Sequence, residues 1–348
     1  MRFVKIIHLA DVHLGSKIES KLPKDKVEIR KSEVRQAFNK VINYANENSI
    51  KIILISGDLF DSARPLKKDK DFFYSVVKNN PDIDFIYLRG NHDSLESFSD
   101  EEPSNLKKFS EKWKTYSYGD VTVSGVEFSK ENKSEVSCGL HLPPDSKNIV
   151  MLHGSIEELP RLAEQNIDYL ALGHIHGFSE VKLNIRGKSV YSGCLEGRGF
   201  DEIGVKGFVV LDTYTMKYEF VKNSVRVIEE YTIDVSKATD SYEAYKIICN
   251  EISLKKENLC LIKVCGEITF DGSSLAEDIE EYMSEKYFFV YVKNKTTEKI
   301  NIEQLAEEIS LKGEFVRIVL ADTKYSEEEK ERIISVGLKA FKGQGVSK

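Results

Sequence analysis

Five short apolar runs, each followed directly by residues that can bind metals, are the feature that most constrains the fold of this chain. The runs span residues 3–10, 50–56, 84–88, 148–152 and 168–172. Their apolar residues are continuous rather than alternating, which indicates strands buried on both faces. An amphipathic helix is expected at 32–47 and a shorter helix at 72–80. Strands that alternate with helices in this way predict a layered α/β domain with a sheet core.

A restricted set of polar residues follows these runs. They are Asp11, His13, Asp58, Asn91, His92, Asp93, His153, His174 and His176. Because ligands of open α/β sheets lie outside the carboxyl ends of the strands, we expect these side chains to meet at one edge. One Asp-x-His sequence alone is more often a solvated turn than a ligand pair. Five of the seven histidines follow these runs, however, and this joint pattern predicts a metal site.

The composition narrows the class of protein. A length of 348 residues suggests two or three domains. No segment approaches the roughly 20 apolar residues that span a bilayer, so no membrane association is expected. His8 and Asp11 interrupt the first apolar run, unlike a signal peptide. Five cysteines without a CxxC pair are typical of reduced thiols in a cytoplasmic protein. The net charge of −7 argues against a protein that coats nucleic acids along their length.

Five ordered motifs identify a family that the chain resembles. "DVHLG", "GDLFD", "GNHD", "LHG" and "GHIH" resemble the calcineurin-like metallophosphoesterase superfamily. Within it, "HLADVHLG", "GDLFDSARP" and "EGRGFDEIGVKGF" (196–208) are similar to the SbcD-type nucleases that repair DNA double-strand breaks. The resemblance covers about the first two-thirds of the chain. It implies a two-sheet sandwich flanked by helices.

The resemblance also implies two divalent metal ions and a role for each motif residue. One ion would be bound by Asp11, His13 and His176. The other would be bound by Asn91, His153 and His174. Asp58 would bridge the two ions. His92 would donate a proton and contact the phosphate, and Asp93 would orient His92.

The chemistry of these residues agrees with such a centre. Nitrogen and oxygen ligands without cysteine exclude a thiolate zinc site, so manganese is the expected metal, with iron or zinc as alternatives. Two ions ~3.5–4 Å apart can hold a phosphate and acidify a water. His92 as an imidazolium could protonate the leaving oxygen, a contribution of ~100- to 10,000-fold. A phosphodiester is therefore the expected substrate.

The loops after the first two motifs are rich in basic residues. The first carries Lys17, Lys21, Lys24, Lys26, Arg30 and Lys31, and the second carries Arg64, Lys67, Lys68 and Lys70. A local basic rim can hold a phosphate backbone even on an acidic protein. The alternative is that both loops are simply solvated. DNA contacts are expected at Lys17, Arg64 and Arg198.

These features predict a metal-dependent DNA nuclease of DNA repair that acts as an exonuclease or an endonuclease. The nucleases that the chain resembles work beside a coiled-coil ATPase of the SbcC type. DNA, such an ATPase and a second copy of the chain in a homodimer are therefore the expected partners. The alternative is a small-substrate metallophosphoesterase, such as a cyclic-nucleotide phosphodiesterase, which would share all five motifs. The complete ligand set argues against a non-catalytic scaffold.

Three domains are expected along the chain. Residues 1–224 would form the metallophosphoesterase domain, 225–298 a small α/β cap domain of alternating strands and helices, and 299–348 a helical segment. Further strands, which would form a second sheet, are expected at 120–128, 188–193, 207–212 and 217–222. The last helix carries an apolar face at Ile334, Leu338 and Phe341. We expect this face to be exposed and to dock a partner, the alternative being that it packs within its own domain.

Overall fold

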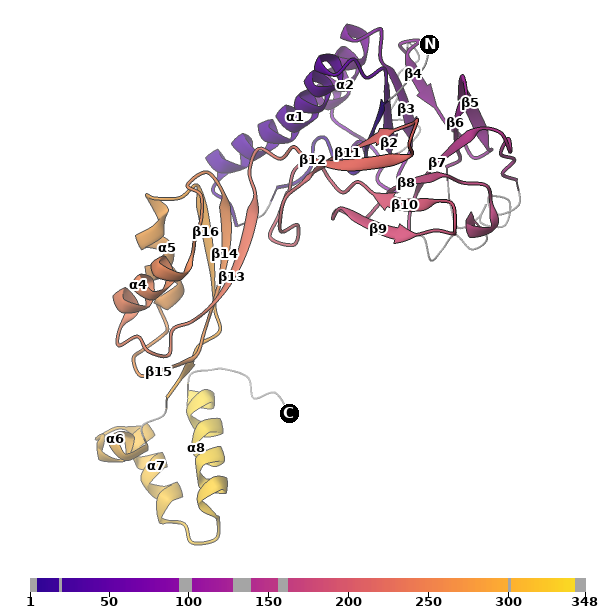
Figure 1. Ribbon diagram of the computed structural model, residues 1–348. Coiled ribbons are helices and arrows are strands. Elements are labelled where there is room, and N and C mark those ends of the chain that lie inside the picture. The colour runs from indigo at the N-terminus through magenta and orange to yellow at the C-terminus, as the bar shows by residue number, and fades with distance from the viewer. Residues whose placement is uncertain are drawn as a thin grey trace. The chain divides into compact units, whose positions relative to one another are not determined.

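Two six-stranded sheets form the first part of the molecule, which is a computed structural model (Figure 1). The structure describes residues 5–18, 21–93, 102–127, 139–155, 162–299 and 302–341. The first unit consists of Met1–Glu230, Leu254–Leu261 and Tyr287–Phe289. The second consists of Tyr231–Ser253, Ile262–Lys286 and Val290–Lys348. The three-domain division expected from the sequence stays a prediction.

The strand order places parallel strands at the centre of each sheet. The first sheet has the order β12 (Lys217–Lys222), β11 (Gly207–Asp212), β1 (Lys5–Leu9), β2 (Ile52–Ser56), β3 (Asp84–Leu88) and β4 (Leu106–Lys108). The second has the order β5 (Lys114–Tyr118), β6 (Val121–Gly125), β7 (Lys147–His153), β8 (Tyr169–Gly173), β10 (Lys188–Tyr191) and β9 (Ser179–Lys182). Strands β1 to β4 are parallel, as are β6, β7, β8 and β10.

The five apolar runs are all strands, but they divide between the two sheets. Runs one to three are β1, β2 and β3, whereas runs four and five are β7 and β8 of the other sheet. The expectation that all five runs end at one edge of a single sheet was therefore too simple. The assignment of 207–212 and 217–222 to the second sheet was wrong, because β11 pairs antiparallel with β1 and β12 pairs with β11. An α/β sandwich of two sheets is confirmed.

Apolar side chains from both sheets fill the space between them. Ile6, Leu54 and Ile86 of the first sheet share one buried cluster with Ile149 and Met151 of the second. Burial on both faces explains the continuous apolar runs, since the opposite face of the first sheet is covered as well.

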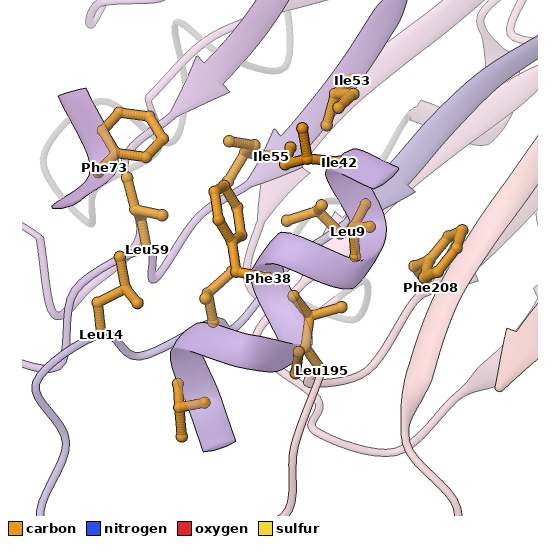
Figure 2. Close-up of a cluster of buried hydrophobic side chains, with 14 of the residues drawn as sticks. Leu9, Leu14, Phe38, Ile42, Ile53, Ile55, Leu59, Phe73, Leu195 and Phe208 are labelled. Carbon is orange, nitrogen blue, oxygen red and sulfur yellow. The ribbon is translucent and has the colours of Figure 1, made fainter. Parts of the chain in front are cut away.

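Two helices cover that opposite face, α1 (Lys24–Glu47) and α2 (Lys67–Asn79). Phe38 of α1 and Phe73 of α2 belong to one buried cluster with Leu9 and Ile55 of the sheet, and Figure 2 labels these residues. Helix α1 begins eight residues earlier than expected, at Lys24 directly after Pro23. The expected first basic loop is thereby shortened. Arg30 lies inside α1 and is fully buried, so its expected place on an exposed loop was wrong.

The second unit contains the predicted alternation of strands and helices. Its elements are β13 (Ile228–Asp234), α4 (Ser241–Glu251), β14 (Leu259–Cys265), α5 (Leu275–Ser284) and β16 (Phe289–Asn294). The three strands form one sheet in the order β13, β14, β16. A short pair, β15 (Glu267–Ile268) and β17 (Thr297–Glu298), accompanies it. The strands β13, β14 and β16 begin within the first unit, so the chain passes between the two units along them.

Three helices follow, α6 (Ile302–Glu307), α7 (Leu311–Ala321) and α8 (Glu327–Phe341). The apolar face of α8 packs on α7: Ile334 is 0% exposed and Leu338 is 9% exposed, in one cluster with Val316 and Val319. The expectation that this face is exposed was therefore wrong for Ile334 and Leu338, and only Phe341 stays 41% exposed. In the described parts of the chain, no helix combines the length and apolar character needed to cross a bilayer.

Candidate metal centre

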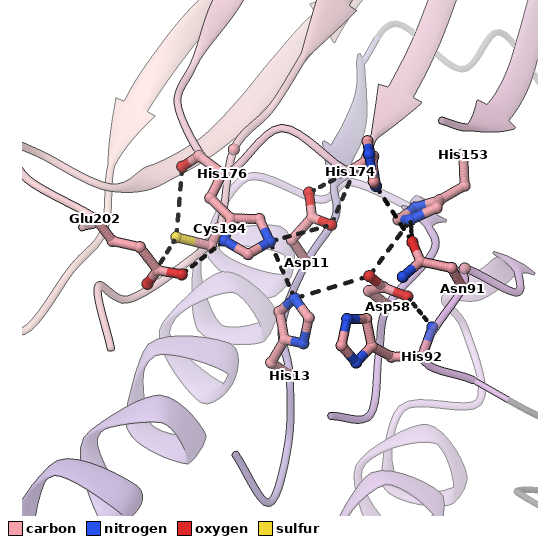
Figure 3. A network of polar contacts seen from close by, with 12 residues as sticks. Asp11, His13, Asp58, Asn91, His92, His153, His174, His176, Cys194 and Glu202 are labelled. Atoms are coloured by element: carbon pink, nitrogen blue, oxygen red, sulfur yellow. Dashed lines mark hydrogen bonds and ion pairs between the residues drawn. The ribbon is translucent and has the colours of Figure 1, made fainter. Parts of the chain in front are cut away.

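The carboxyl ends of strands from both sheets bring the predicted ligands together. Asp11 and His13 follow β1, Asp58 follows β2 and Asn91 follows β3. His153 ends β7, while His174 and His176 follow β8. Figure 3 shows all seven side chains around one centre. Asp11, His13, Asp58 and His153 are buried, whereas Asn91 and His174 are exposed, so the centre opens to solvent on one side.

The three residues predicted for the first ion form one cluster. The metal-binding atoms of Asp11, His13 and His176 lie within 4.8 Å of one another. Nε2 of His13 is 3.2 Å from Nε2 of His176, and the latter atom is 4.0 Å from Oδ1 of Asp11. Such spacings suit donor atoms that share a single cation.

The residues predicted for the second ion converge on the amide oxygen of Asn91. This Oδ1 atom is 3.0 Å from Nε2 of His153 and 3.2 Å from Nδ1 of His174. Asp58 lies between the two clusters, because its Oδ2 atom is 3.3 Å from Nε2 of His153 and 3.9 Å from Nε2 of His13. The geometry thus suits a bridging carboxylate. The ligand roles themselves stay predictions.

Backbone strain is concentrated at the same residues. Among the described residues, six other than glycine have a positive φ angle, and four of these are predicted ligands. They are Asp11 (51°), His13 (50°), Asp58 (48°) and His174 (100°). Residues other than glycine adopt this region at a cost, and it persists where function requires a particular direction of the side chain. The backbone is therefore strained at the four residues whose side chains point toward the centre.

Glycine at position 57 is required by the close approach of His153. The φ angle of Gly57 is +91°, and a Cβ atom there would lie 2.1 Å from Nδ1 of His153. We expect Gly57→Ala to displace the His153 ring and to lower the number of Mn²⁺ ions bound per chain, measured by metal analysis. Gly119→Ala is the matched control, because Gly119 also has a positive φ (+67°) but open space around it. It should cost ~1–2 kcal/mol of stability and leave metal content unchanged. Equal metal content in both variants would contradict this role of Gly57.

The electrostatics of the cluster suit divalent cations. Burial raises the pKa of Asp11 to about 6. Burial also opposes ionisation of Asp58, but the hydrogen bond and charge of His153, the backbone N–H of His92 and the charge of His13 together outweigh it and lower the pKa of Asp58 to about 2. Burial disfavours the charged form of His153, but Asp58, Asp11 and the carbonyl oxygen of Ser56 together outweigh it and raise the pKa of His153 to about 9. A bound cation would supply positive charge to both carboxylates and replace the proton on His153, as metal ligation requires.

The contacts of the two histidines in the first cluster also suit a cation. Nδ1 of His13 and Nδ1 of His176 both face carboxylate oxygens, of Asp61 and Glu202. The hydrogen bond from Nδ1 of His176 to Glu202 leaves the Nε2 lone pair of His176 directed at Nε2 of His13, 3.2 Å away. A cation placed between these two nitrogens would accept both lone pairs. The residues present thus fit a metal ion at this position.

His92 and Asp93 occupy different positions beside this centre. The backbone N–H of His92 donates to Oδ1 of Asp58 at 2.8 Å, and its exposed ring places Nδ1 3.2 Å from the carbonyl oxygen of Asp61. Asp93 was expected to orient His92. Its carboxylate instead accepts backbone N–H groups of Leu59, Phe60 and Gly90. Asp93 therefore ties the loop after β2 to the loop after β3.

The predicted substrate contacts differ in their exposure. Lys17 and Arg64 are exposed. Arg198 is only 16% exposed, and its guanidinium donates to Asp61 at 2.8 Å and to Glu202 at 2.6 Å. A substrate contact of Arg198 stays a prediction. Lys26 of the expected basic rim lies over the rings of Phe288 and Phe289, with Nζ 5.6 and 5.8 Å from their centroids.

Sequence reasoning missed Asp61 and Glu202, which contact two of the predicted ligands. Both lie inside motifs that were already singled out, "GDLFD" and "EGRGFDE". Metal-binding histidines almost always donate their second N–H to an acceptor such as a carboxylate. An acid within a ligand motif was the signal that could have identified both residues.

Comparisons with known proteins agree with this geometry. The chain is 25% identical over 362 residues to the DNA double-strand break repair protein Mre11 of Sulfurisphaera tokodaii, covering 96% of this chain and 84% of that protein. It is 22% identical over 360 residues to the protein of the same name from Thermoplasma acidophilum, covering 92% and 91%. It is also 26% identical over 296 residues to the uncharacterized metallophosphoesterase YhaO of Bacillus subtilis, covering 77% and 72%.

A family model confirms the resemblance predicted from the five motifs. The calcineurin-like phosphoesterase model matches residues 4–178, which are 175 of the 348 residues of the chain. The matched range contains all seven predicted ligands and His92. The chain therefore belongs to the calcineurin-like phosphoesterase family and is an enzyme that hydrolyses phosphate esters.

Proposed function

We propose that the chain is a metal-dependent nuclease that hydrolyses phosphodiester bonds of DNA during repair, as an exonuclease and endonuclease. The observation that carries this proposal is the convergence of seven ligand side chains in two clusters that share Asp58. Asp11, His13 and His176 would hold one divalent ion, and Asn91, His153 and His174 would hold the other. Manganese suits these nitrogen and oxygen donors, as iron or zinc also would.

When bound, the two ions supply Lewis acidity that neutralises phosphate charge and lowers the pKa of an attacking water. The chain itself supplies orientation and a proton. His92 donates its Nδ1 hydrogen to the carbonyl oxygen of Asp61, which leaves Nε2 to deliver a proton to the leaving oxygen. The backbone N–H of His92 donates to the carboxylate of Asp58, so the His92 ring and the Asp58 carboxylate are positioned by the same turn. Asp93 supports that turn through three backbone N–H groups.

The choice of DNA rests on the relatives and on the rim of the centre. Two of the relatives above are named as DNA double-strand break repair proteins, over more than nine-tenths of this chain. Lys17 and Lys21 are exposed in the segment between the first motif and α1, and the exposed Lys24 is the first residue of α1. A second candidate is a small-substrate metallophosphoesterase such as a cyclic-nucleotide phosphodiesterase. The similarity to YhaO, an uncharacterized metallophosphoesterase, keeps this candidate open.

The partners and the remaining domains belong to the same proposal. We infer a cytoplasmic enzyme that works with a coiled-coil ATPase of the SbcC type and forms a homodimer. Residues 225–298 would form the cap domain. Residues 299–348 would offer a docking segment, whose available surface is not the α8 face buried against α7.

The deciding experiment compares substrates in the presence of Mn²⁺. Purified chain is given linear duplex DNA, single-stranded DNA, bis-(p-nitrophenyl) phosphate and a cyclic nucleotide. We expect degradation of DNA and hydrolysis of the model diester, both abolished by a chelator. Hydrolysis of the cyclic nucleotide without degradation of DNA would favour the second candidate instead.

The same assay tests the basic rim. Replacing Lys17, Lys21 and Lys24 together by serine should weaken DNA binding, because each lost phosphate contact on duplex lowers the log–log salt slope by about 0.9. Hydrolysis of bis-(p-nitrophenyl) phosphate should stay unchanged. The measurement is DNA affinity at several salt concentrations.

A charge-matched triple variant is the control. The control lysines lie away from the carboxyl ends of the strands. Lys51 directly precedes β2, Lys217 is the first residue of β12, and Lys78 lies at the end of α2. Changing these three to serine removes the same net charge and should preserve the salt slope. Equal salt slopes in the two triple variants would mean that Lys17, Lys21 and Lys24 are solvated and make no specific contact with DNA. Equal loss of ester hydrolysis would mean that the rim supports the centre itself.

A further inference from the structure

Two carboxylates stand directly behind the two histidines of the first metal cluster. Oδ1 of Asp61 lies 3.1 Å from Nδ1 of His13, and Oε1 of Glu202 lies 2.6 Å from Nδ1 of His176. Figure 3 shows Glu202 on the side of His176 that faces away from the cluster. Glu202 is almost fully buried, so its carboxylate is available to the protein rather than to solvent.

One arginine joins these two carboxylates. Nη1 of Arg198 donates to Asp61 at 2.8 Å, and Nη2 donates to Glu202 at 2.6 Å. The backbone N–H of Arg198 also donates to Oε2 of Glu202 at 2.7 Å. A planar guanidinium that binds two carboxylates fixes both in position. Arg198 therefore holds both carboxylates and, through them, both histidine rings.

The backbone of the His176 loop is held by the same segment. Nζ of the buried Lys206 donates to the carbonyl oxygen of His176 at 3.0 Å, and the N–H of Cys194 donates to that oxygen at 3.2 Å. Arg198, Glu202 and Lys206 all lie beyond residue 178, where the match to the family model ends. A later segment of the chain thus completes a centre whose ligands come from the matched domain.

The second cluster has a weaker acceptor behind its buried histidine. Nδ1 of His153 donates to the carbonyl oxygen of Ser56 at 2.9 Å. A carbonyl oxygen is neutral, whereas Asp61 and Glu202 present carboxylate oxygens to His13 and His176. An acceptor behind a metal-binding imidazole fixes the tautomer and raises the basicity of the ligand nitrogen, and a charged acceptor does so more strongly.

We propose that Asp61, Arg198 and Glu202 form a clamp that positions His13 and His176 and makes the first cluster bind its ion more tightly than the second. The proposal rests on the ligand assignment of the proposed function. Asp61, Arg198 and Glu202 are positioning residues, because they act through the histidines. The clamp holds each Nε2 lone pair toward the cluster before an ion arrives, so the rings lose little freedom on binding.

The test is a titration of the full chain with Mn²⁺ alone, followed by the electron paramagnetic resonance signal of the free ion. The wild type should bind two ions with different affinities. Glu202→Gln keeps the shape of the side chain but removes its charge, and should weaken the tighter site ~10- to 100-fold while the weaker site keeps its affinity. Raising the Mn²⁺ concentration should restore hydrolysis of bis-(p-nitrophenyl) phosphate.

Glu196→Gln is the matched control on the same segment. Glu196 is equally buried but accepts from Arg30 and from the N–H of Val225, away from both histidines. This variant should leave both Mn²⁺ affinities unchanged, even if its stability falls. Equal weakening of metal binding in the two variants would mean that the segment acts only by folding, and would overturn the clamp.

A double variant separates positioning from general support. If Glu202 acts chiefly through His176, Glu202→Gln should weaken Mn²⁺ binding much less in the His176→Ala protein than in the wild type, whereas independent effects would add in full. A wild type that binds no Mn²⁺ would overturn the proposed function. A wild type that binds two ions, with Glu202→Gln affinities unchanged, would overturn the clamp alone.

Discussion

Replacing Asp58 by alanine is expected to remove the metal pair and to abolish hydrolysis of phosphodiesters. Asp58 is buried, and its Oδ2 atom lies 3.3 Å from His153 and 3.9 Å from His13, one residue of each cluster. Without this side chain each ion would lose one ligand. No carboxylate would then lie between the two cations to offset their mutual repulsion. Even residues behind a ligand cost about 10- to 100-fold when replaced, so the shared ligand should cost at least about 100-fold in activity.

Metal analysis and diester hydrolysis measure this effect together. Loss of His176 alone should remove less metal than loss of Asp58, because His176 belongs to one cluster only. Asp84→Asn is the control: Asp84 begins β3 at the opposite edge of the sheet and pairs with Lys107 and Tyr118. It should keep two ions per chain. An Asp58→Ala protein that retains both ions would contradict the bridging role.

The strands and the converging side chains could be predicted because both signals are local. A strand buried on both faces is a continuous apolar run, and a parallel strand presents its next residues at the carboxyl edge. β3 therefore matches the predicted run at 84–88 residue for residue. The positive φ angles at Asp11 and Asp58 could not be predicted in this way, because the surrounding structure imposes them.

The partition into two sheets depends on pairing between distant segments. Lys5 of β1 pairs with Asp212 of β11, more than 200 residues later in the chain. No pattern within either segment specifies this pairing, so 207–212 was assigned to the wrong sheet. The carboxyl ends of β1 and β8 face one centre only because the two sheets pack through residues such as Ile6 and Met151.

Charged residues were misplaced where they are paired internally. Arg30 looked like part of a basic loop, yet it is fully buried with Glu33 and Glu196 as partners. A buried arginine needs such carboxylates, and one of them comes from a segment 166 residues away. The buried face of α8 likewise depends on α7, since Ile334 and Val316 share one cluster. Exposure in both cases is a property of the tertiary fold.

Replacing His92 by alanine is expected to separate catalysis from metal binding. The contact of His92 with Asp58 is made by its backbone N–H, at 2.8 Å, and alanine retains that group. The variant should therefore keep two Mn²⁺ ions and bind DNA as the wild type does. Turnover of DNA should fall by ~100- to 10,000-fold, the contribution of a general acid. His141→Ala is the control, because His141 is exposed and contacts the carbonyl oxygen of Gly139.

The leaving group decides whether His92 acts as an acid. Cleavage of DNA expels an alkoxide of a sugar, which is a poor leaving group until it is protonated. Cleavage of bis-(p-nitrophenyl) phosphate expels p-nitrophenolate, which is stable without a proton. If Nε2 of His92 delivers the proton, His92→Ala should slow hydrolysis of the model diester less than about tenfold, against ~100-fold or more for DNA. Equal losses on both substrates, with the metals still bound, would instead assign His92 to contact with the phosphate group that the two substrates share.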